Sequence, residues 1–374
     1  MGRKLLFVAS SDAHICQFHL PYLLQLRQEG WTVHAACRCG AGKIPYADRV
    51  LDVPFRKQMF SPANLRAARQ LRKQMRKQDY DTVIVHTSLA AFFTRLAVMG
   101  LNRRPKVINM VHGYLFDRQS SWPKRSILLL AEKLTAPVTD LLITMNRCDG
   151  EIARKHRLCR QIAFVPGVGV DFPGLEARRT GCPETLRRSL DIKPEDFVLI
   201  YPAEFSKRKM QTVLLHAMAR LPENAVLVLP GQGSRLDDCE KLAQKLGISH
   251  RVRFPGHVQD IAPWYEMADA AVSSSRSEGL PFNIMEAMYF ALPVVASETK
   301  GHTDLIRHRE TGLLYPCGDA AACAKQIRLL MDEPQLARSL SKAASKQAAR
   351  YSLSRVQPQV MELYHRILDT NEPS

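Results

Sequence analysis

Two glutamates could carry chemistry in the stretch RSEGLPFNIMEAMYFALPVVAS (276–297), because Glu278 and Glu286 stand in an otherwise apolar run. Buried carboxylates cost free energy unless opposite charges or hydrogen bonds compensate. The pair therefore either lies on a solvated face, with Glu278 capping the helix that follows, or faces a pocket and holds a ligand. The apolar residues around Glu286 favour the pocket.

The residues between the two glutamates predict a helix N-terminus beside this pocket. Pro281 suits the first turn of a helix over residues 281–290. Backbone N–H groups at a helix N-terminus bind anions, and Gly279 leaves room for an anion to approach. We therefore expect Gly279 and Leu280 to lie against a diphosphate, and Glu286 to accept hydrogen bonds from vicinal hydroxyls such as those of a ribose.

A second candidate group is the basic stretch FSKRKMQ (205–211), which follows an expected strand over 197–202. When a bond to a diphosphate breaks, negative charge develops on the phosphate oxygens. Fixed cations such as Arg208 and Lys209 stabilise that charge more in the transition state than in the ground state. The alternative is a solvated basic turn.

A third candidate is His112, which follows an expected strand over 106–111 and could hydrogen-bond a sugar hydroxyl. An isolated histidine is more often structural. The stretch SSDAHICQFH (10–19) is expected to form a loop before a helix over 17–29, with His14 and His19 as weaker candidates. It lacks the GxGxxG pattern of dinucleotide binding.

Short apolar runs alternate with amphipathic stretches along the chain, which predicts an α/β fold of parallel sheets with helices on both faces. We expect an N-terminal Rossmann-like domain over 1–180, a C-terminal one over 181–353, and a final helix in 354–374 that packs back towards the first domain. Open sheets of this kind bind ligands at the carboxyl ends of their strands, so the cleft between the two facing domains is the expected site. The expected strands are 5–10, 32–37, 82–87, 106–112, 141–145, 162–166, 197–202, 225–231, 252–256, 270–275, 293–297 and 312–315.

The composition of the 374 residues is that of a globular protein, with 46% hydrophobic and 24% charged residues. No run of apolar residues is long enough to span a bilayer. The nine cysteines lack both a CxxC pair and metal-ligand spacing. These features predict a cytoplasmic protein with no metal site.

Positive charge is concentrated in the first half, where residues 1–180 hold 29 Lys/Arg against 13 Asp/Glu, while residues 181–374 hold 24 against 23. Such a bias suggests an anionic partner. A basic helix over 62–78 and the stretch WPKRSILLLAEKL (122–134) could lie on anionic lipid, which would place the protein on the inner face of the cell membrane. The alternative for each helix is a solvated face backed by core residues.

The sequence also resembles a known family. SEGLPFNIMEAMYFALPVVAS is similar to the signature of the GT-B-type retaining glycosyltransferases of family 4, in which two glutamates grip the nucleotide sugar. Further blocks resemble that family in the expected order and cover nearly the whole chain: FVASSDAHICQFHLPYLLQLRQEGWTVHAAC, VINMVHGYLF, VPGVGVDF, YPAEFSKRKMQTVL and KGHTDLIRHRETGLLYP. The closest likeness is to bacterial enzymes that build capsule or exopolysaccharide.

The resemblance implies transfer of a hexose or N-acetylhexosamine from a nucleoside-diphosphate sugar, most simply a UDP-sugar, to a glycan or polyprenyl-linked acceptor, without a cofactor or an essential metal. It implies that Lys209 and Arg208 bind the diphosphate, that Glu278 and His112 attend the sugar, and that Glu286 holds the ribose. The remaining residues expected at the donor are Gly279, Leu280, Asn283, Gly231, Val258 and Gly301. The alternative for Gly231, Val258 and Gly301 is that each lies in a plain turn. The chain departs from the family where Ala203-Glu204 replaces the usual Gly-Arg, so that Arg208 must supply the missing contact or the contact is absent.

Two other functions remain open at this point. A nucleotide-sugar epimerase would share the donor and the two-domain fold, but would show paired acid and base carboxylates at the anomeric centre. A nucleic-acid binder would explain the net charge of +17, although the basic residues are not interleaved with stacking aromatics. We therefore expect a glycosyltransferase that binds no nucleic acid.

Overall fold

The computed structural model describes residues 3–40, 43–117 and 120–369, which fall into two compact units. The first unit spans residues 1–168 and 356–374, and the second spans residues 169–355. The expected boundary at residue 180 therefore lies inside the second unit, because α7 (Phe172–Ala177) packs there and its Phe172 ring stacks on Tyr289 at 4.2 Å between centroids. Residues 370–374, the end of the expected third segment, lie outside the described residues.

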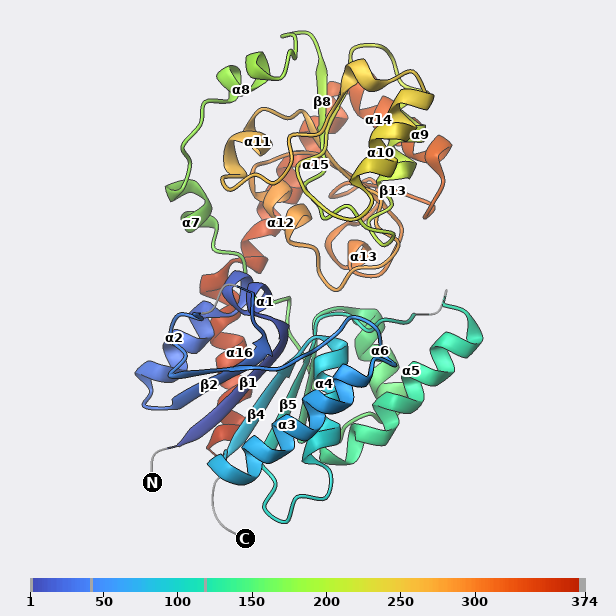
Figure 1. The fold of residues 1–374 in the computed structure, drawn as a ribbon. Coiled ribbons are helices and arrows are strands. Elements are labelled where there is room, and N and C mark those ends of the chain that lie inside the picture. The colour runs from blue at the N-terminus through green and yellow to red at the C-terminus, as the bar shows by residue number, and fades with distance from the viewer. Residues whose placement is uncertain (1–2, 41–42, 118–119, 370–374) are drawn as a thin grey trace. The chain divides into compact units, whose positions relative to one another are not determined.

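Within the described residues, the first unit holds a seven-stranded parallel sheet in the order β3-β2-β1-β4-β5-β6-β7 (Figure 1). Leu6 pairs with His34 on one side of β1 and with Val83 on the other. Helices cover both faces, which explains the nearly continuous apolar runs of its strands. The strands are β1 (Lys4–Ser11), β2 (Thr32–Arg38), β3 (Arg49–Asp52), β4 (Thr82–His86), β5 (Lys106–Val111), β6 (Leu141–Thr144) and β7 (Ile162–Phe164).

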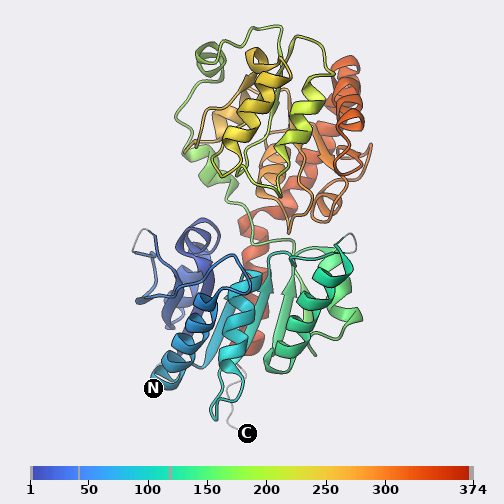
Figure 2. The ribbon, with the colours of Figure 1, turned by 45° about the vertical axis from the view of Figure 1, so that its right-hand side comes forward.

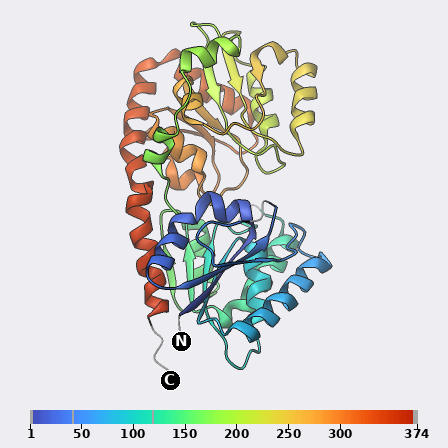
Figure 3. The same cartoon turned by 60° about the vertical axis from the view of Figure 1, so that its left-hand side comes forward.

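Two helices, α3 and α4, lie side by side on one face of this sheet and bury Leu71 and Phe93 against it (Figure 2). The last helix, α16, lies along α2 in the same unit: Gln357 donates to the carbonyl of Pro21 at 3.2 Å (Figure 3). The helices are α1 (Asp12–Phe18), α2 (Leu20–Gln28), α3 (Pro62–Gln78), α4 (Ser88–Val98), α5 (Trp122–Thr135), α6 (Arg147–Lys155) and α16 (Leu353–Leu368), with a 3₁₀ turn at Ala136–Val138.

Two features of the first unit differ from the sequence-based expectation. The expected loop at 10–19 is mostly helical: the Ser11 side chain accepts a hydrogen bond from the backbone of His14 and caps α1. The chain then breaks at His19 before a second helix with Pro21 in its first turn. The edge strand β3 was not predicted, because its four residues, RVLD, are too short and too charged to show a strand pattern.

Within the described residues, the second unit holds a six-stranded parallel sheet in the order β10-β9-β8-β11-β12-β13. Alternate residues of β8 enter different cores: Leu199 packs with α9, α10 and α14, whereas Val198 and Ile200 pack with α12 and α15. The two parallel sheets wrapped by helices confirm the predicted fold class. The strands are β8 (Phe197–Ile200), β9 (Ala225–Val228), β10 (Val252–Arg253), β11 (Ala270–Ser273), β12 (Val294–Ser297) and β13 (Leu313–Tyr315).

The helices of the second unit are α7, α8 (Pro183–Ser189), α9 (Gln211–Met218), α10 (Leu236–Lys245), α11 (Ala262–Glu266), α12 (Phe282–Tyr289), α13 (His302–Leu305), α14 (Ala320–Asp332) and α15 (Pro334–Ala348), with 3₁₀ turns at Ser249–Arg251 and Ala349–Tyr351. None of the helices among the described residues combines the length and the apolar character needed to cross a bilayer.

Candidate active site

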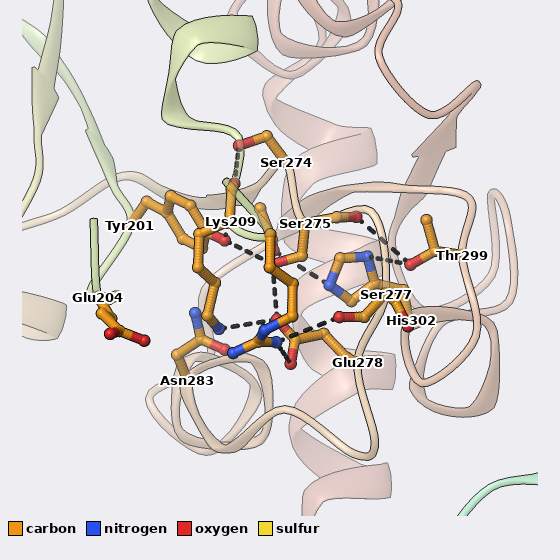
Figure 4. A network of polar contacts seen from close by, with 12 residues as sticks. Tyr201, Glu204, Lys209, Ser274, Ser275, Ser277, Glu278, Asn283, Thr299 and His302 are labelled. Carbon is orange, nitrogen blue, oxygen red and sulfur yellow. Dashed lines mark hydrogen bonds and ion pairs between the residues drawn. The ribbon is translucent and has the colours of Figure 1, made fainter. Parts of the chain in front are cut away.

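The loops that follow β8 and β11 lie against each other, because these two strands are neighbours in the parallel sheet of the second unit. The backbone N–H of Arg276 donates to the carbonyl of Arg208 at 3.0 Å. The hydroxyl of Ser274 donates to the carbonyl of Lys209 at 2.8 Å. Tyr201, just after β8, shares a 2.8 Å hydrogen bond with the hydroxyl of Ser275 (Figure 4). The basic loop and the glutamate loop thus form one hydrogen-bonded structure.

Glu278 is buried at the centre of this structure, with both of its carboxylate oxygens paired. Its Oε1 lies 2.7 Å from the Lys209 Nζ and accepts a 2.6 Å hydrogen bond from Ser275, while its Oε2 lies 2.5 Å from Arg208 Nη1 (Figure 4). Burial alone would raise the pKa of Glu278, but the charges of Lys209 and Arg208 outweigh it and hold the pKa at about 2. Glu278 is therefore a carboxylate at neutral pH. It does not cap α12, whose N-cap residue is Pro281.

The two cations of this cluster differ in exposure. The side chain of Lys209 is only 12% exposed, whereas that of Arg208 is 46% exposed and also donates to the carbonyl of Ser277 at 3.1 Å. A second carboxylate, Glu204, acts electrostatically on Arg208 from the β8 loop (Figure 4). Arg208 and Lys209 together outnumber the one carboxylate that both of them contact, which leaves this pair able to take an anion.

The start of α12 is attached to the same loops. Asn283 donates from its side-chain amide to the carbonyl of Pro202, after β8, at 3.1 Å. The sequence predicted Pro281 in the first turn of this helix. In the structure, Pro281 precedes α12 as its N-cap residue. The segment of Gly279 and Leu280 leads directly into this N-terminus, where aligned peptide dipoles favour a negative charge.

Gly301 lies directly against the glutamate loop. A Cβ at Gly301, whose φ is +83°, would lie 2.8 Å from the Gly279 carbonyl oxygen and 2.9 Å from Glu278 Cβ. The next residue, His302, is buried and bonds to the ends of two strands. Its Nδ1 lies 2.7 Å from the Ser297 carbonyl and its Nε2 lies 3.1 Å from the Ser273 hydroxyl. Burial lowers the pKa of His302 to about 4, so its ring is neutral and Nδ1–H donates to the carbonyl.

Glu286 lies further along α12 and is partly buried. Its Oε2 accepts a 2.8 Å hydrogen bond from the Tyr265 hydroxyl. Burial raises the pKa of Glu286, although the hydrogen bond from Tyr265 and the charge of Arg178 act in the opposite direction. Sequence analysis missed both partners, because neither Tyr265 nor Arg178 lies in a motif and only the fold brings them to α12.

Val258 lines an open pocket of about 550 Å³ between residues 178–189 and 258–264. Arg178 belongs to the same lining, so the pocket adjoins the region of Glu286. Gly231 has a different surrounding: a Cβ there would lie 2.0 Å from the carbonyl oxygen of Ala203. Position 231 thus requires glycine, because its backbone lies very close to that of Ala203. Ala203 is also the residue that replaces the glycine usual in the family.

The first unit gathers four histidines where β4 and β5 end. His112 and His86 share a 2.9 Å hydrogen bond between ring nitrogens, and His14 and His19 share one of 3.3 Å. The rings of His19 and His86 lie 4.0 Å apart between centroids. His112 is thus not isolated. Sequence analysis missed His86, although TVIVHT and VINMVH both end a strand in histidine.

No carboxylate contributes to the pKa shifts of these four histidines. Burial lowers the pKa of His14 to about 4 and holds the pKa values of His19, His86 and His112 well below the usual range. All four rings are therefore neutral at pH 7. Ligand atoms of His14, His19 and His112 lie within 4.8 Å of one another, so these three could hold a metal ion.

The predicted site residues thus fall into two groups. The structure brings Glu278, Arg208, Lys209, Gly279 and Gly301 into one contact network in the second unit. Asn283 and Glu286 lie on the adjoining helix, and Val258 lies in the adjoining pocket. His112 belongs to the first unit, with the other histidines.

Known proteins resemble this chain along its whole length. Residues 23–171 match the family model Glycosyltransferase Family 4, and residues 183–347 match the model Glycosyl transferases group 1. EpsD of Bacillus subtilis (strain 168), named as a glycosyltransferase, is 35% identical over 381 residues that cover 100% of both chains. An Escherichia coli protein named UDP-Gal:alpha-D-GlcNAc-diphosphoundecaprenol alpha-1,3-galactosyltransferase is 25% identical over 71% of this chain and 70% of its own.

Solved structures show the same fold. HepE of Anabaena, in complex with UDP and glucose, matches with a TM-score of 0.79 over 97% of this chain and 100% of its own, at 20% identity. Sucrose-phosphate synthase from Thermosynechococcus elongatus matches with a TM-score of 0.79 over 99% of this chain and 100% of its own, also at 20% identity.

Proposed function

Because this chain belongs to the family 4 glycosyltransferases and has their GT-B fold, we propose that it transfers a hexose or N-acetylhexosamine from a UDP-sugar to a glycan or lipid-linked sugar acceptor. Family membership favours a transferase over the two alternatives raised by the sequence, a nucleotide-sugar epimerase and a nucleic-acid binder. The proposal extends the family assignment by naming the donor, the acceptor class and the residues that act.

The observation that carries the proposal is the cluster of buried Glu278 with Lys209 and Arg208 at the carboxyl ends of β8 and β11. Two fixed cations held next to a helix N-terminus suit a diphosphate. In the absence of donor, Glu278 neutralises part of their charge. We propose that the diphosphate oxygens share these cations when the donor binds, while Glu278 keeps its charge and accepts a hydrogen bond from a sugar hydroxyl.

The remaining contacts would orient the nucleotide. Glu286, positioned by the Tyr265 hydroxyl, would accept hydrogen bonds from the ribose hydroxyls. The pocket lined by Val258 adjoins this region and is open enough for a planar base. HepE binds UDP on the same fold, which supports a uridine nucleotide as the donor.

The transfer itself would proceed with retention of anomeric configuration. The bond between the sugar C1 and the diphosphate oxygen breaks, and the acceptor oxygen bonds to C1 on the same face. The acceptor's proton passes to the departing phosphate oxygen, so that no protein base is needed. Lys209 and Arg208 stabilise the charge that builds on the leaving diphosphate, which is the role of a divalent cation in metal-dependent transferases.

The acceptor class rests on the relatives. The Escherichia coli relative is named for an acceptor sugar on diphosphoundecaprenol, and EpsD is named as a glycosyltransferase. We propose that this chain likewise extends a glycan in polysaccharide biosynthesis, on a capsule or exopolysaccharide repeat unit.

A donor panel tests the proposal. Purified protein is mixed in turn with UDP-glucose, UDP-galactose, UDP-N-acetylglucosamine, GDP-mannose and ADP-glucose, and thermal unfolding is followed. We expect a UDP-sugar to raise the melting temperature most, because ligand binding to the folded state stabilises it. Preferential stabilisation by GDP-mannose or ADP-glucose would contradict the donor assignment. An epimerised sugar formed without any acceptor would revive the epimerase.

The absence of a metal requirement is tested with the same protein. We expect EDTA to change the rate of UDP release by less than twofold, because Arg208 and Lys209 supply the positive charge. A loss of activity that Zn²⁺ or Mn²⁺ restores would contradict this expectation. Such a loss would instead indicate a metal ion, for which His14, His19 and His112 are the candidate ligands.

A further inference from the structure

Helix α5 (Trp122–Thr135) turns its apolar side chains outward. Trp122 is 79% exposed, Leu130 is 68%, Leu134 is 50% and Ile127 is 47%. At 100° per residue these four positions fall within ~140° of one another around the helix axis, so they form one face. This face of α5, defined by these four residues, is the reverse of an ordinary amphipathic helix, whose apolar side is buried.

The inner side of α5 is already occupied by its own unit. Leu128 and Leu129 pack against the core that includes Ile152. Glu132, also on the inner side, forms a buried ion pair with Arg95 at 2.8 Å. The helix is therefore anchored without the four outward residues, which do not serve its folding.

The charges around the exposed face are positive. Among the described residues of α5, exposed Lys133 lies within this face on the helical wheel and exposed Lys124 lies beyond its edge. Half-buried Arg125 lies ~20° from Glu132, the acidic residue of the helix, on the inner side. Neighbouring α6 adds exposed Arg154 and Lys155, together with one exposed acid, Glu151. Burial and the charges of Lys133, Lys155 and Arg125 lower the pKa of His156.

We propose that the exposed face of α5 docks on an anionic lipid bilayer, with its four apolar side chains among the headgroups and Lys124 and Lys133 against the lipid phosphates. A tryptophan at one end of an apolar stripe with flanking lysines and arginines is the composition of an interfacial helix. The excess of basic residues in residues 1–180, 29 against 13 acidic, adds long-range attraction to such a surface.

A second copy of the chain fits this face less well. A stable protein interface takes roughly 20–30 residues from each partner, whereas this face offers four large apolar side chains on one helix. Its surrounding cations would also repel the same cations on a twofold-related copy. A bilayer needs no complementary shape and supplies the opposite charge.

The basic helix α3 provides a contrast within the same unit. Arg66, Arg69 and Lys73 are exposed, but Leu71 and Met75 face the core. Its one large exposed apolar residue among those described is Leu65, at 50% exposure. The sequence suggested both helices as lipid contacts. The structure assigns α3 the ordinary solvated face, so its contribution to docking is electrostatic alone.

The docking surface is tested by co-sedimentation of the full chain with vesicles. One vesicle type contains phosphatidylglycerol in phosphatidylcholine and the other is pure phosphatidylcholine. The variant Ile127→Ser/Leu130→Ser/Leu134→Ser removes apolar surface from exposed positions. The matched control is Leu65→Ser on α3. We expect the wild type to bind anionic vesicles, the α5 variant to lose at least tenfold in partitioning, and the control to stay within twofold.

Tryptophan emission supplies a second readout. Trp122 is exposed, and its emission should shift to shorter wavelength on anionic vesicles; Trp122→Phe should abolish the shift. Circular dichroism and thermal unfolding verify that each variant is folded. Equal binding of the wild type to neutral vesicles, or unchanged binding of the folded α5 variant, would overturn the proposal. So would a wild-type dimer that the α5 variant dissociates, without vesicle binding. None of these readouts depends on the donor or on catalysis.

Discussion

Titratable side chains cluster where the central strands of both sheets end, but one cluster stays charged when buried and the other becomes neutral. In the second unit, Glu278 is buried with Lys209 and Arg208, and its pKa is held at about 2. In the first unit, buried His19 and His86 lie with half-buried His14 and His112, and burial lowers the pKa values of all four until the rings are neutral. A counter-charge at 2.5–2.7 Å keeps a buried group ionised, whereas its absence removes the charge.

This difference suits the two clusters to different tasks. A cluster that stays ionised can stabilise a change in charge, such as that of a leaving diphosphate. A neutral imidazole cluster can donate hydrogen bonds to hydroxyl groups and accept hydrogen bonds from them. The charged cluster therefore has the larger expected effect on turnover.

The largest effect should follow Lys209→Ala. Removing this cation leaves buried Glu278 with one partner and withdraws positive charge from the leaving group, so we expect kcat to fall by about 10²–10³-fold, or ~3–4 kcal/mol. The control is Lys207→Ala, two residues away and exposed, which should stay within twofold. The rate of UDP release with donor and acceptor measures both. Equal activity in two folded variants would show that the charged cluster does not act on the leaving group.

A smaller effect should follow Glu286→Gln. The amide keeps an oxygen for the Tyr265 hydroxyl but loses one of its acceptors, so the donor KM should rise about tenfold with little change in kcat. Tyr265→Phe, which removes only the positioning hydrogen bond, should raise KM by about threefold. Steady-state kinetics with varied donor separate KM from kcat. If kcat falls while KM stays constant in Glu286→Gln, the carboxylate acts on the transferred group and not on the ribose.

The last effect concerns the free energy of unfolding as a function of pH, and it bears on folding rather than on turnover. His14 has a folded pKa of about 4, below its unfolded value of about 6.5, so the unfolded state binds more protons between these values. Its contribution to stability is therefore complete above pH 6.5 and declines as the pH falls towards 4, by about 2 kcal/mol at pH 5. Urea unfolding at pH 7 and pH 5 should show a smaller loss in His14→Gln than in the wild type.

The charged cluster responds in a different pH range. Glu278 has a folded pKa of about 2 against its ordinary value of 4.5, so its contribution is lost only as the pH falls from 4.5 towards 2. His302 in the same unit titrates in the same pH range as His14, since its pKa is also about 4.

For the His14 prediction, an identical pH dependence of the free energy of unfolding in the wild type and His14→Gln between pH 7 and 5 would mean that His14 is not neutralised by burial.

Much of this fold could be predicted from local patterns. The apolar β-branched runs mark most of the strands, and the alternation with helices predicts parallel sheets. The edge strand β3 escaped because four residues with charged ends carry too little pattern. The break at His19 escaped because a single helix over 17–29 also matches the apolar spacing, and only the capping of α1 by Ser11 moves its start upstream.

Parts of the candidate site were predictable for the same reason. Residues at the ends of parallel strands meet at one edge of a sheet, so Glu278, Arg208 and Lys209 could be expected near one another. Their roles in transfer stay predictions. His86, Tyr265 and Arg178 act on site residues from distant segments and lie in no stretch that the sequence singled out. His302 lies in the block KGHTDLIRHRETGLLYP, but only the fold shows its hydrogen bond with Ser273.

The amino-acid sequence by itself determined the periodicity of the helices and strands, the family, and the residue types available at the strand ends, because these depend on neighbours along the chain. Only the tertiary structure decided which charges are paired, which histidines are neutral, and that α5 rather than α3 shows an apolar face to solvent. Pairing and burial depend on segments that approach one another in space, and both α3 and α5 contain leucines and basic residues, so only their packing decides which side of each helix is covered.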